Sequence, residues 1–288
     1  MYESSVTPVP SLSAPALSGL GLITGQLKDS SMKVIILAGG LGTRLREETE
    51  FKPKPMVEIG GKPILWHIMK NFAHFGITDF IVASGYKNEY IKDYFLNYES
   101  RQQDFTVKIG SPGEATFHGS KNSENWSVTI ADTGELSLTG ERVRIASKYL
   151  DPGEPFMVAY GDGLADLDIN KLIKFHKQKK GIATLASVQP ISRYGVLELN
   201  DDSEVVNFRE KPVSSNWINI GFFVFDYKVL DFLDDGPLEI GPLKSLSEQG
   251  QLRAYRHSGF WQPMDTIREV ELLNSLWDSG TLPWRVDK

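Results

Sequence analysis

The sequence predicts an α/β protein whose central sheet is mixed, mostly parallel and flanked by helices. Strand and helix patterns alternate along residues 33–179, and such alternation predicts βαβ units with right-handed crossovers. The first strand, residues 34–38, is a continuous apolar run, which is typical of a parallel strand covered on both faces. After residue 182 the segments resemble strands joined by short turns, so we expect the second half to make the sheet mixed.

Each element has its own pattern in the chain. The helix predicted from residue 64 has apolar residues at helical spacing, Pro63 near its start and Gly76 at its end. A last amphipathic helix is predicted by Ile267, Val270, Leu273, Leu276 and Trp277. The other expected strands are 80–83, 156–160, 183–188, 195–199, 205–209 and 218–225, and the other expected helices are 89–97, 138–150 and 169–179.

Composition excludes several classes of protein. The chain has 288 residues, a formal net charge of −6 and no basic run long enough for a nucleic-acid patch, so we expect no DNA or RNA partner. No apolar run approaches the roughly 20 residues of a spanning helix, and we expect a soluble protein without a membrane partner. The absence of cysteine excludes thiolate chemistry and favours a cytoplasmic location.

The chain divides at residue 32. Residues 1–31 are rich in Ser, Pro, Leu and Gly, have no helical or strand period and lack the basic start of a signal peptide. We expect a disordered N-terminal tail here. No Ser/Gly linker or repeat follows, so residues 32–288 are predicted to form one catalytic domain.

A glycine-rich segment follows the first strand directly. Its residues are Leu37, Ala38, Gly39, Gly40, Leu41, Gly42, Thr43 and Arg44. Glycines let the backbone approach a ligand and turn N–H groups toward anionic oxygens, so the segment is a candidate phosphate-binding loop. A ligand-free turn is an equally good interpretation of the glycines alone. The spacing matches neither the dinucleotide fingerprint nor the P-loop.

A second cluster, Lys52-Pro53-Lys54-Pro55-Met56, favours the phosphate interpretation. The prolines stiffen the segment that holds two ammonium groups, and Arg44 supplies a planar fork that matches phosphate oxygens. Such a group of cations suits a triphosphate.

Two aspartates are candidate metal ligands. Asp162 follows the strand 156–160, and ligands of open α/β sheets bind outside the carboxyl ends of strands. Asp265 is either a second ligand or the N-cap of the last helix, and the sequence favours neither interpretation. Asp166 and Asp168 are predicted to be helix-capping residues.

Glu210, Lys211 and Asn219 lie beside later strands. The first two are either contacts for sugar hydroxyls and a phosphate or an exposed ion pair of little value. The five histidines show no metal-ligand spacing or triad order, and we expect all of them to be structural, with His176 and His257 lacking a recognisable partner.

From residue 32 onward the chain resembles the sugar-phosphate nucleotidyltransferases. LAGGLGTRL indicates the superfamily, while EETEFKPKPMVEIGGKPILWHIMK, YGDGLADLDI and GFWQPMDT are similar to the members that use CTP. The resemblance implies a Rossmann-like nucleotidyltransferase domain that forms homo-oligomers. It further implies that CTP and α-D-glucose 1-phosphate give CDP-glucose and pyrophosphate, for the dideoxysugars of bacterial surface polysaccharides such as O-antigen.

The resemblance also implies roles for individual residues. The loop from Leu37 to Arg44, with Lys54, Ser137, Arg142 and Gly161, would bind the nucleotide; Glu210, Lys211 and Asn219 would bind the sugar phosphate; and Asp162 and Asp265 would bind Mg²⁺. Arg44, Lys54 and Asp162 would be catalytic.

The expected reaction needs no side-chain nucleophile. A phosphate monoester has a second pKa near 6, so the attacking oxygen of a sugar phosphate is already anionic at neutral pH. Two alternatives remain open at this point: a uridylyl- or thymidylyltransferase acting on glucose 1-phosphate, and a regulatory protein that binds a nucleotide without turnover.

Overall fold

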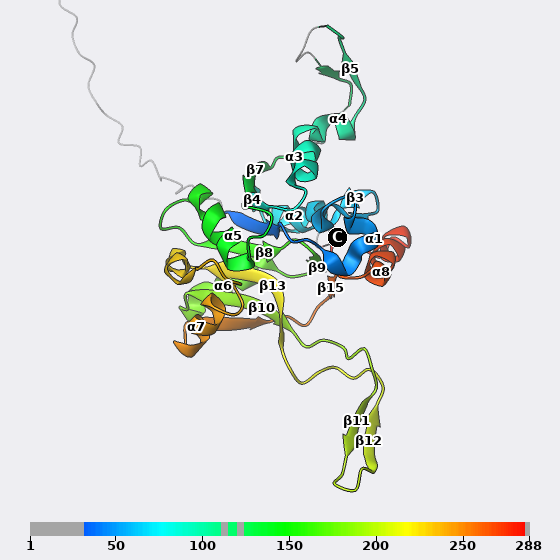
Figure 1. Cartoon of the computed structure of the whole chain (residues 1–288), viewed down its shortest axis with the longest axis vertical. Coiled ribbons are helices and arrows are strands. Elements are labelled where there is room, and N and C mark those ends of the chain that lie inside the picture. The colour runs from blue at the N-terminus through cyan, green and yellow to red at the C-terminus, as the bar shows by residue number, and fades with distance from the viewer. Residues whose placement is uncertain (1–31, 111–114, 120–123, 286–288) are drawn as a thin grey trace, which may run out of the picture. The chain divides into compact units, whose positions relative to one another are not determined.

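The computed structural model describes residues 32–110, 115–119 and 124–285. These residues form a seven-stranded sheet with the order β14-β10-β13-β8-β1-β4-β7 (Figure 1). Its strands are β1 (Val34–Ala38), β4 (Asp79–Ser84), β7 (Ser127–Asp132), β8 (Phe156–Tyr160), β10 (Ala183–Val188), β13 (Ile218–Phe225) and β14 (Leu252–Arg256). Only β13 runs antiparallel to its neighbours, so the predicted mixed, mostly parallel sheet is confirmed.

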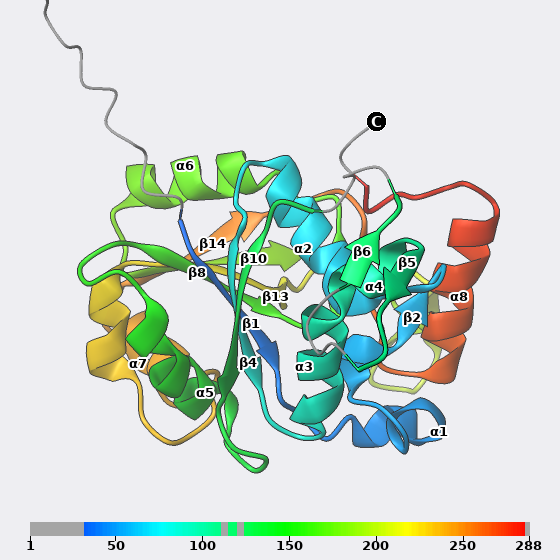
Figure 2. The same ribbon diagram turned by 90° about the horizontal axis from the view of Figure 1, so that it is seen from above.

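Helices cover both faces of the sheet (Figure 2). They are α1 (Arg46–Thr49), α2 (Ile64–His74), α3 (Asn88–Leu96), α4 (Tyr98–Gln102), α5 (Thr139–Ala146), α6 (Ile169–Lys179), α7 (Pro242–Glu248) and α8 (Ile267–Asp278). Four short 3-10 turns accompany them: η1 (Thr43–Leu45), η2 (Lys54–Met56), η3 (Ser147–Tyr149) and η4 (Tyr227–Phe232).

Alternation along β1 explains why the sheet has two cores. Val34, Ile36 and Ala38 join a cluster that includes residues of α2 and α6, whereas Ile35 and Leu37 join a cluster with α5 and α7. All five residues of β1 are buried because successive side chains point to opposite faces and both faces are covered. The continuous apolar run in the sequence has this cause.

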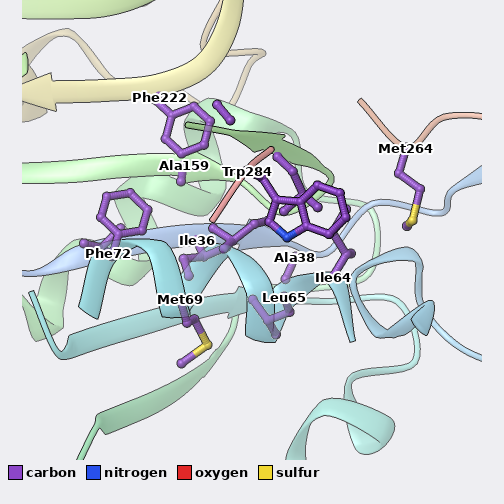
Figure 3. Close-up of a cluster of buried hydrophobic side chains, with 14 of the residues drawn as sticks. Ile36, Ala38, Ile64, Leu65, Met69, Phe72, Ala159, Phe222, Met264 and Trp284 are labelled. Atoms are coloured by element: carbon purple, nitrogen blue, oxygen red, sulfur yellow. The ribbon is translucent and has the colours of Figure 1, made fainter. Parts of the chain in front are cut away.

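The first cluster also receives the segment that follows α8. Figure 3 shows the Trp284 ring among Ile36, Ala38 and Ile64, and its side chain is fully buried. Burying an aromatic side chain of this size contributes on the order of 2–3 kcal/mol. The last helix and its extension are therefore part of the same core as β1.

Four smaller sheets contain the remaining strands. They pair β2 (Glu58–Ile59) with β3 (Lys62–Pro63), β5 (Phe105–Val107) with β6 (Ala115–Phe117), β9 (Gly163–Ala165) with β15 (Trp261–Pro263), and β11 (Val196–Leu199) with β12 (Val205–Arg209). We expected β11 and β12 to extend the mixed sheet, and this was wrong. They form a separate hairpin that extends away from the main sheet in Figure 1, and all its residues are exposed.

The described residues all belong to one compact unit. The predicted disordered tail, residues 1–31, lies outside the described residues. Across the part of the chain that the structure describes, no helix combines the length and apolarity required to cross a bilayer.

Candidate active site

The carboxyl ends of four strands meet at one edge of the sheet. β8, β1, β4 and β7 are neighbours in that order and run parallel, so the segments that follow them leave the sheet on the same side. The chain proceeds from β1 to β4 and β7 on one side and returns to β8 on the other. In open α/β sheets, ligands bind at such a reversal of strand order, which here lies between β1 and β8.

The glycine-rich loop after β1 lies at this reversal. Gly40, Leu41, Thr43 and Arg44 are exposed, although the strand that precedes them is buried. Gly42 has a φ of 62°, which a residue with a side chain rarely adopts. The Thr49 hydroxyl donates hydrogen bonds to the carbonyls of Gly42 (3.0 Å) and Leu45 (2.9 Å). These bonds fix the backbone at the end of the loop, while the exposed residues of the loop stay accessible to a ligand.

Lys54 lies between the two predicted metal ligands. Its Nζ donates to Asp162 Oδ2 and to Asp265 Oδ1, each at 2.6 Å, and its side chain is 10% exposed. Arg44 Nη1 lies 3.0 Å from the other carboxylate oxygen, Asp265 Oδ2. Residues that are 211 positions apart in the chain therefore form one cluster of two anions and two cations.

Backbone pairing brings the two aspartates together. β9 and β15 pair directly beside them, with Gly163 opposite Pro263, and Met264 N donates to the Asp162 carbonyl at 2.8 Å. Asp162 comes directly before Gly163 and Asp265 directly after Met264, so the two side chains face the same ammonium group.

The neighbours of Asp265 show that it is not the N-cap of the last helix. Thr266 is the N-cap of α8 and forms a capping box with Glu269. Glu269 Oε2 accepts hydrogen bonds from Asp265 N (2.7 Å) and Thr266 N (2.9 Å). Asp265 is therefore not the cap, and its carboxylate is directed to Lys54 and Arg44.

The stiffened segment predicted around Lys54 is the turn η2. Pro53 is its N-cap residue with extended backbone, Pro55 lies inside it, and Val57 N donates back to the Lys54 carbonyl at 3.1 Å. Pro55 lies beside Gly161, just after β8, and Gly161 N donates to the Leu37 carbonyl at 3.0 Å; Lys54 Cβ lies beside Gly42 of the loop. This fixes the base of the lysine side chain close to the glycine-rich loop.

The donors at this point fit a divalent cation. Two carboxylates already hold a positive charge between them, and Mg²⁺ prefers oxygen ligands from one or two carboxylates completed by water and substrate phosphates. Among the described residues, no group of three or more His, Cys, Asp or Glu side chains makes a site that the protein alone would complete. The pair fits a metal that a phosphorylated substrate helps to bind.

Arg142 connects the loop to the ends of β4 and β7. Its side chain is buried, and the guanidinium donates to the carbonyls of Gly39 (2.9 Å), Ser84 (3.3 Å), Gly134 (2.7 Å) and Glu135 (3.0 Å) and to the Thr133 hydroxyl (2.7 Å). Burial lowers the pKa of Arg142, while Glu141 and Asp132 oppose that shift. All five bonds go to protein groups, so Arg142 shapes the floor of the site.

Ser137 lies near this floor. Its Oγ lies 3.1 Å from the position that a Cβ atom would take on Gly134. Whether Ser137 and Arg142 also touch a nucleotide stays a prediction.

The predicted sugar contacts are not all brought together. Asn219 lies at the edge of the site, where its Nδ2 is 3.4 Å from the Tyr160 hydroxyl and its Oδ1 accepts from Gly221 N at 2.9 Å. Glu210 and Lys211 follow β12 in the hairpin region with side chains 62% exposed, and within the described ranges their ion pair is with each other, at 3.9 Å. Their role as sugar contacts stays a prediction.

Several groups near the site were missed in the sequence. Tyr160 hydrogen-bonds to Glu239, which also accepts from the Thr139 hydroxyl at 2.8 Å. Glu239 lies in a segment without strand or helix period, so no pattern could pair it with Tyr160.

The predictions for the neighbouring acids and histidines had mixed outcomes. Asp168 caps α6 by accepting from Lys171 N at 2.9 Å, as predicted. Asp166 is not a cap, and our expectation was wrong: its Oδ1 lies 2.9 Å from His257 Nε2. His257 and His176 both have partners, since His176 Nδ1 lies 2.9 Å from the Thr184 hydroxyl. The cause is contact between different elements, α6 with β10 for His176 and the segments around Asp166 and His257, which helical spacing does not encode.

The fold and site together define a nucleotide-handling transferase, and comparison with known proteins agrees. The family model described as nucleotidyl transferase matches residues 33–250, and the chain belongs to this family. It is 48% identical over 257 residues to the glucose-1-phosphate cytidylyltransferase of Salmonella typhimurium, with 88% of this chain and 99% of the relative covered.

Solved structures show the same fold. HddC from Yersinia pseudotuberculosis superposes with a TM-score of 0.61 at 25% identity, covering 85% of this chain and 99% of that one. An apo UDP-glucose pyrophosphorylase gives a TM-score of 0.62 at 16% identity, covering 87% and 99%, a likeness that concerns the fold alone.

Proposed function

We propose that this chain is a glucose-1-phosphate cytidylyltransferase, which converts CTP and α-D-glucose 1-phosphate into CDP-glucose and pyrophosphate. The observation that supports it most directly is the cluster of Asp162, Asp265, Lys54 and Arg44 beside the glycine-rich loop. The choice of CTP and glucose 1-phosphate rests on the 48% identity to the Salmonella relative over almost its whole length.

The chemistry is a direct displacement. An anionic phosphate oxygen of the sugar attacks the α-phosphorus of CTP in line, the new P–O bond forms, and the bond to the bridging oxygen of pyrophosphate breaks. Because the attacking oxygen is already deprotonated near pH 7, no general base is required. The work left to the protein is to position two anions and to neutralise their charge.

Residues on both sides of the reaction centre would share that work. The loop from Leu37 to Arg44 and the backbone of Gly161 would hold the triphosphate, with Ser137 and Arg142 on the nucleoside side. Lys54 and Arg44 would stabilise the departing pyrophosphate. Asp162 and Asp265 would hold Mg²⁺, which when bound draws charge from the phosphoryl oxygens.

The sugar phosphate would enter from the side of β13. Asn219 and the Tyr160 hydroxyl lie there in contact, which supplies hydrogen-bonding groups for a hexose. We propose that Glu210 and Lys211, at the base of the β11–β12 hairpin, complete the sugar-phosphate site. Residues 32–288 would form the nucleotidyltransferase domain, in agreement with a family match that spans 33–250.

A nucleotide panel tests the function. CTP, UTP, dTTP, ATP and GTP are each incubated with glucose 1-phosphate and Mg²⁺, and pyrophosphate release and product mass are measured. We expect CTP to be preferred and CDP-glucose to form. Preference for UTP or dTTP would place the chain among the uridylyl- or thymidylyltransferases, and binding of CTP without product would identify a regulatory protein.

We further propose that the chain forms a homo-oligomer in the cytoplasm and supplies CDP-glucose for the dideoxysugars of surface polysaccharides. The β11–β12 hairpin supports assembly, since Val206 is 62% exposed and Phe208 is 60% exposed, and single chains seldom leave such side chains uncovered in groups. Light scattering on the full chain tests it: we expect a mass above 32.2 kDa that falls in a Phe208→Glu variant.

A further inference from the structure

The position of Lys54 conflicts with the simplest assignment of roles. Both aspartates are assigned to a divalent ion and Lys54 to the triphosphate, yet the ammonium nitrogen lies 2.6 Å from an oxygen of each carboxylate. Those two oxygens are consequently no farther apart than twice that distance. A cation that shared them would occupy the same space as the ammonium group and would repel it.

The local structure confines any rearrangement to the lysine side chain. The backbone of Lys54 is fixed by the η2 turn, by Pro53 and Pro55 on either side, and by the hydrogen bond from Val57 N. The aspartates are fixed by the β9–β15 pairing and by the capping box of α8. A four-carbon side chain on a fixed backbone can turn its ammonium group away, since its rotamers differ little in energy.

We propose that Lys54 is a built-in counter-ion that closes the metal site of the free protein and moves to the triphosphate when a divalent ion takes its place. The inference rests on the proposed function, because it assumes the two aspartates as metal ligands. It adds a coupling: the ion and the nucleotide bind together, since displacing Lys54 from the carboxylates supplies a cation to the phosphates.

The charges of the free site explain why such a device stabilises the protein. Without Lys54, two carboxylates with side chains 34% and 20% exposed would face each other, and Arg44 contacts one of them, Asp265. Removing one partner of a partly buried ion pair is destabilising because the other charge stays behind without compensation. The same lysine therefore stabilises the metal-free protein and lowers its affinity for a metal.

The test measures metal binding without substrates. Mn²⁺, used as a probe for the site, is titrated into wild type and Lys54→Met, and free Mn²⁺ is followed by electron paramagnetic resonance. Met keeps the volume of the side chain and removes its charge. We expect Mn²⁺ to bind the variant at least about tenfold more tightly than wild type. Equal or weaker binding by the variant would overturn the proposal.

The matched control is Lys52→Met. Lys52 lies two residues away and pairs with Glu48 at 3.8 Å, so its loss should leave Mn²⁺ affinity unchanged. An equal gain in both variants would show a general charge effect and would also overturn the proposal. If Lys54→Met does not fold, Lys54→Gln is measured in its place.

A second readout separates the counter-ion from a purely structural role. In EDTA, the Lys54 variant should unfold at a lower temperature than wild type, and saturating Mn²⁺ should remove most of that difference. A difference that Mn²⁺ leaves unchanged contradicts the counter-ion role. Failure of the proposed function appears separately, as absent product in the wild-type nucleotide panel.

Discussion

The guanidinium of Arg142 packs directly against the backbone of Gly39. Arg142 Nη2 donates to the Gly39 carbonyl at 2.9 Å, and a Cβ atom at position 39 would overlap the guanidinium group. A Cβ atom at position 85 would also overlap the guanidinium group of Arg142. The first glycine of the loop is thus required by a buried cation from α5, a relationship that lies entirely inside the protein.

We predict that Gly39→Ala destabilises the protein. The guanidinium cannot give way, because five hydrogen bonds hold it, so the new methyl group overpacks the site at a cost of about 1–3 kcal/mol. Urea unfolding measures the loss. Gly40→Ala is the control, since nothing lies within 4 Å of a Cβ there, and its stability should be unchanged. Equal stability of both variants would contradict the steric argument.

Arg142→Lys should separate the connecting role of this residue from its charge. An ammonium group cannot reach five acceptors on three segments, so we expect a loss of about 2–4 kcal/mol and a raised KM for CTP. Denaturant unfolding and steady-state kinetics measure the two effects. The control is Arg144→Lys on the same helix, which changes an exposed ion pair with Asp235. Its free energy of unfolding should change by no more than about 0.5 kcal/mol, and its KM for CTP should stay unchanged.

Asp162→Asn should reduce turnover and leave the fold intact. The amide keeps the shape of the side chain and removes one of the two negative charges that face Lys54, and losing one such electrostatic group costs on the order of 10²- to 10³-fold in rate. Pyrophosphate release and circular dichroism measure turnover and fold. Asp168→Asn is the control, because Asn caps a helix as well as Asp, and near-normal turnover in Asp162→Asn would refute the assignment.

Thr266→Ala should weaken the start of α8. The variant loses the hydrogen bond that the Thr266 side chain accepts from the backbone of Glu269 in the capping box. N-cap losses of this type cost about 0.5–2 kcal/mol. Thr266→Ser retains the hydroxyl and should stay near wild type. Urea unfolding compares the two, and a variant pair with equal stability would show that Glu269 alone fixes the segment of Asp265.

His67 should make stability depend on pH. Burial lowers its pKa to about 4 from 6.5, despite a 2.9 Å contact with the Ile59 carbonyl that favours the protonated ring. Because the folded-state pKa is the lower one, stability is complete above pH 6.5 and falls as the pH drops toward about 4, by on the order of 3 kcal/mol.

Unfolding free energies at pH 7, 5.5 and 4 measure this dependence. His67→Gln cannot gain a proton in this range, and its amide can still donate to the Ile59 carbonyl. We expect its stability to fall less between pH 6.5 and pH 4 than that of wild type. An identical decrease in the two proteins would assign the effect to other groups.

The main elements could be predicted because their causes are local. The strand β1 is predicted by its continuous apolar run. The helix α2 is predicted by apolar residues at helical spacing and by Pro63 and Gly76 near its ends. The edge strand β7 was missed, since its residues are mostly half-buried or exposed and give no apolar run. Strands β11 and β12 were found with near-correct limits. Their separation from the main sheet could not be predicted, because it depends on which strands pair with each other in the folded chain.

By itself, the sequence determined the fold class, the glycine-rich loop after β1 and the stiff segment around Lys54, and it marked Asp162 and Asp265 as candidate metal ligands. All of these lie in short segments with recognisable patterns of residue types. Only the tertiary structure decided that Thr266 caps α8 and so frees Asp265, that Lys54 holds both carboxylates, and that Asp166 pairs with His257. The physical reason is distance along the chain: contacts between residues far apart in sequence depend on strand pairing and packing, which no local pattern contains.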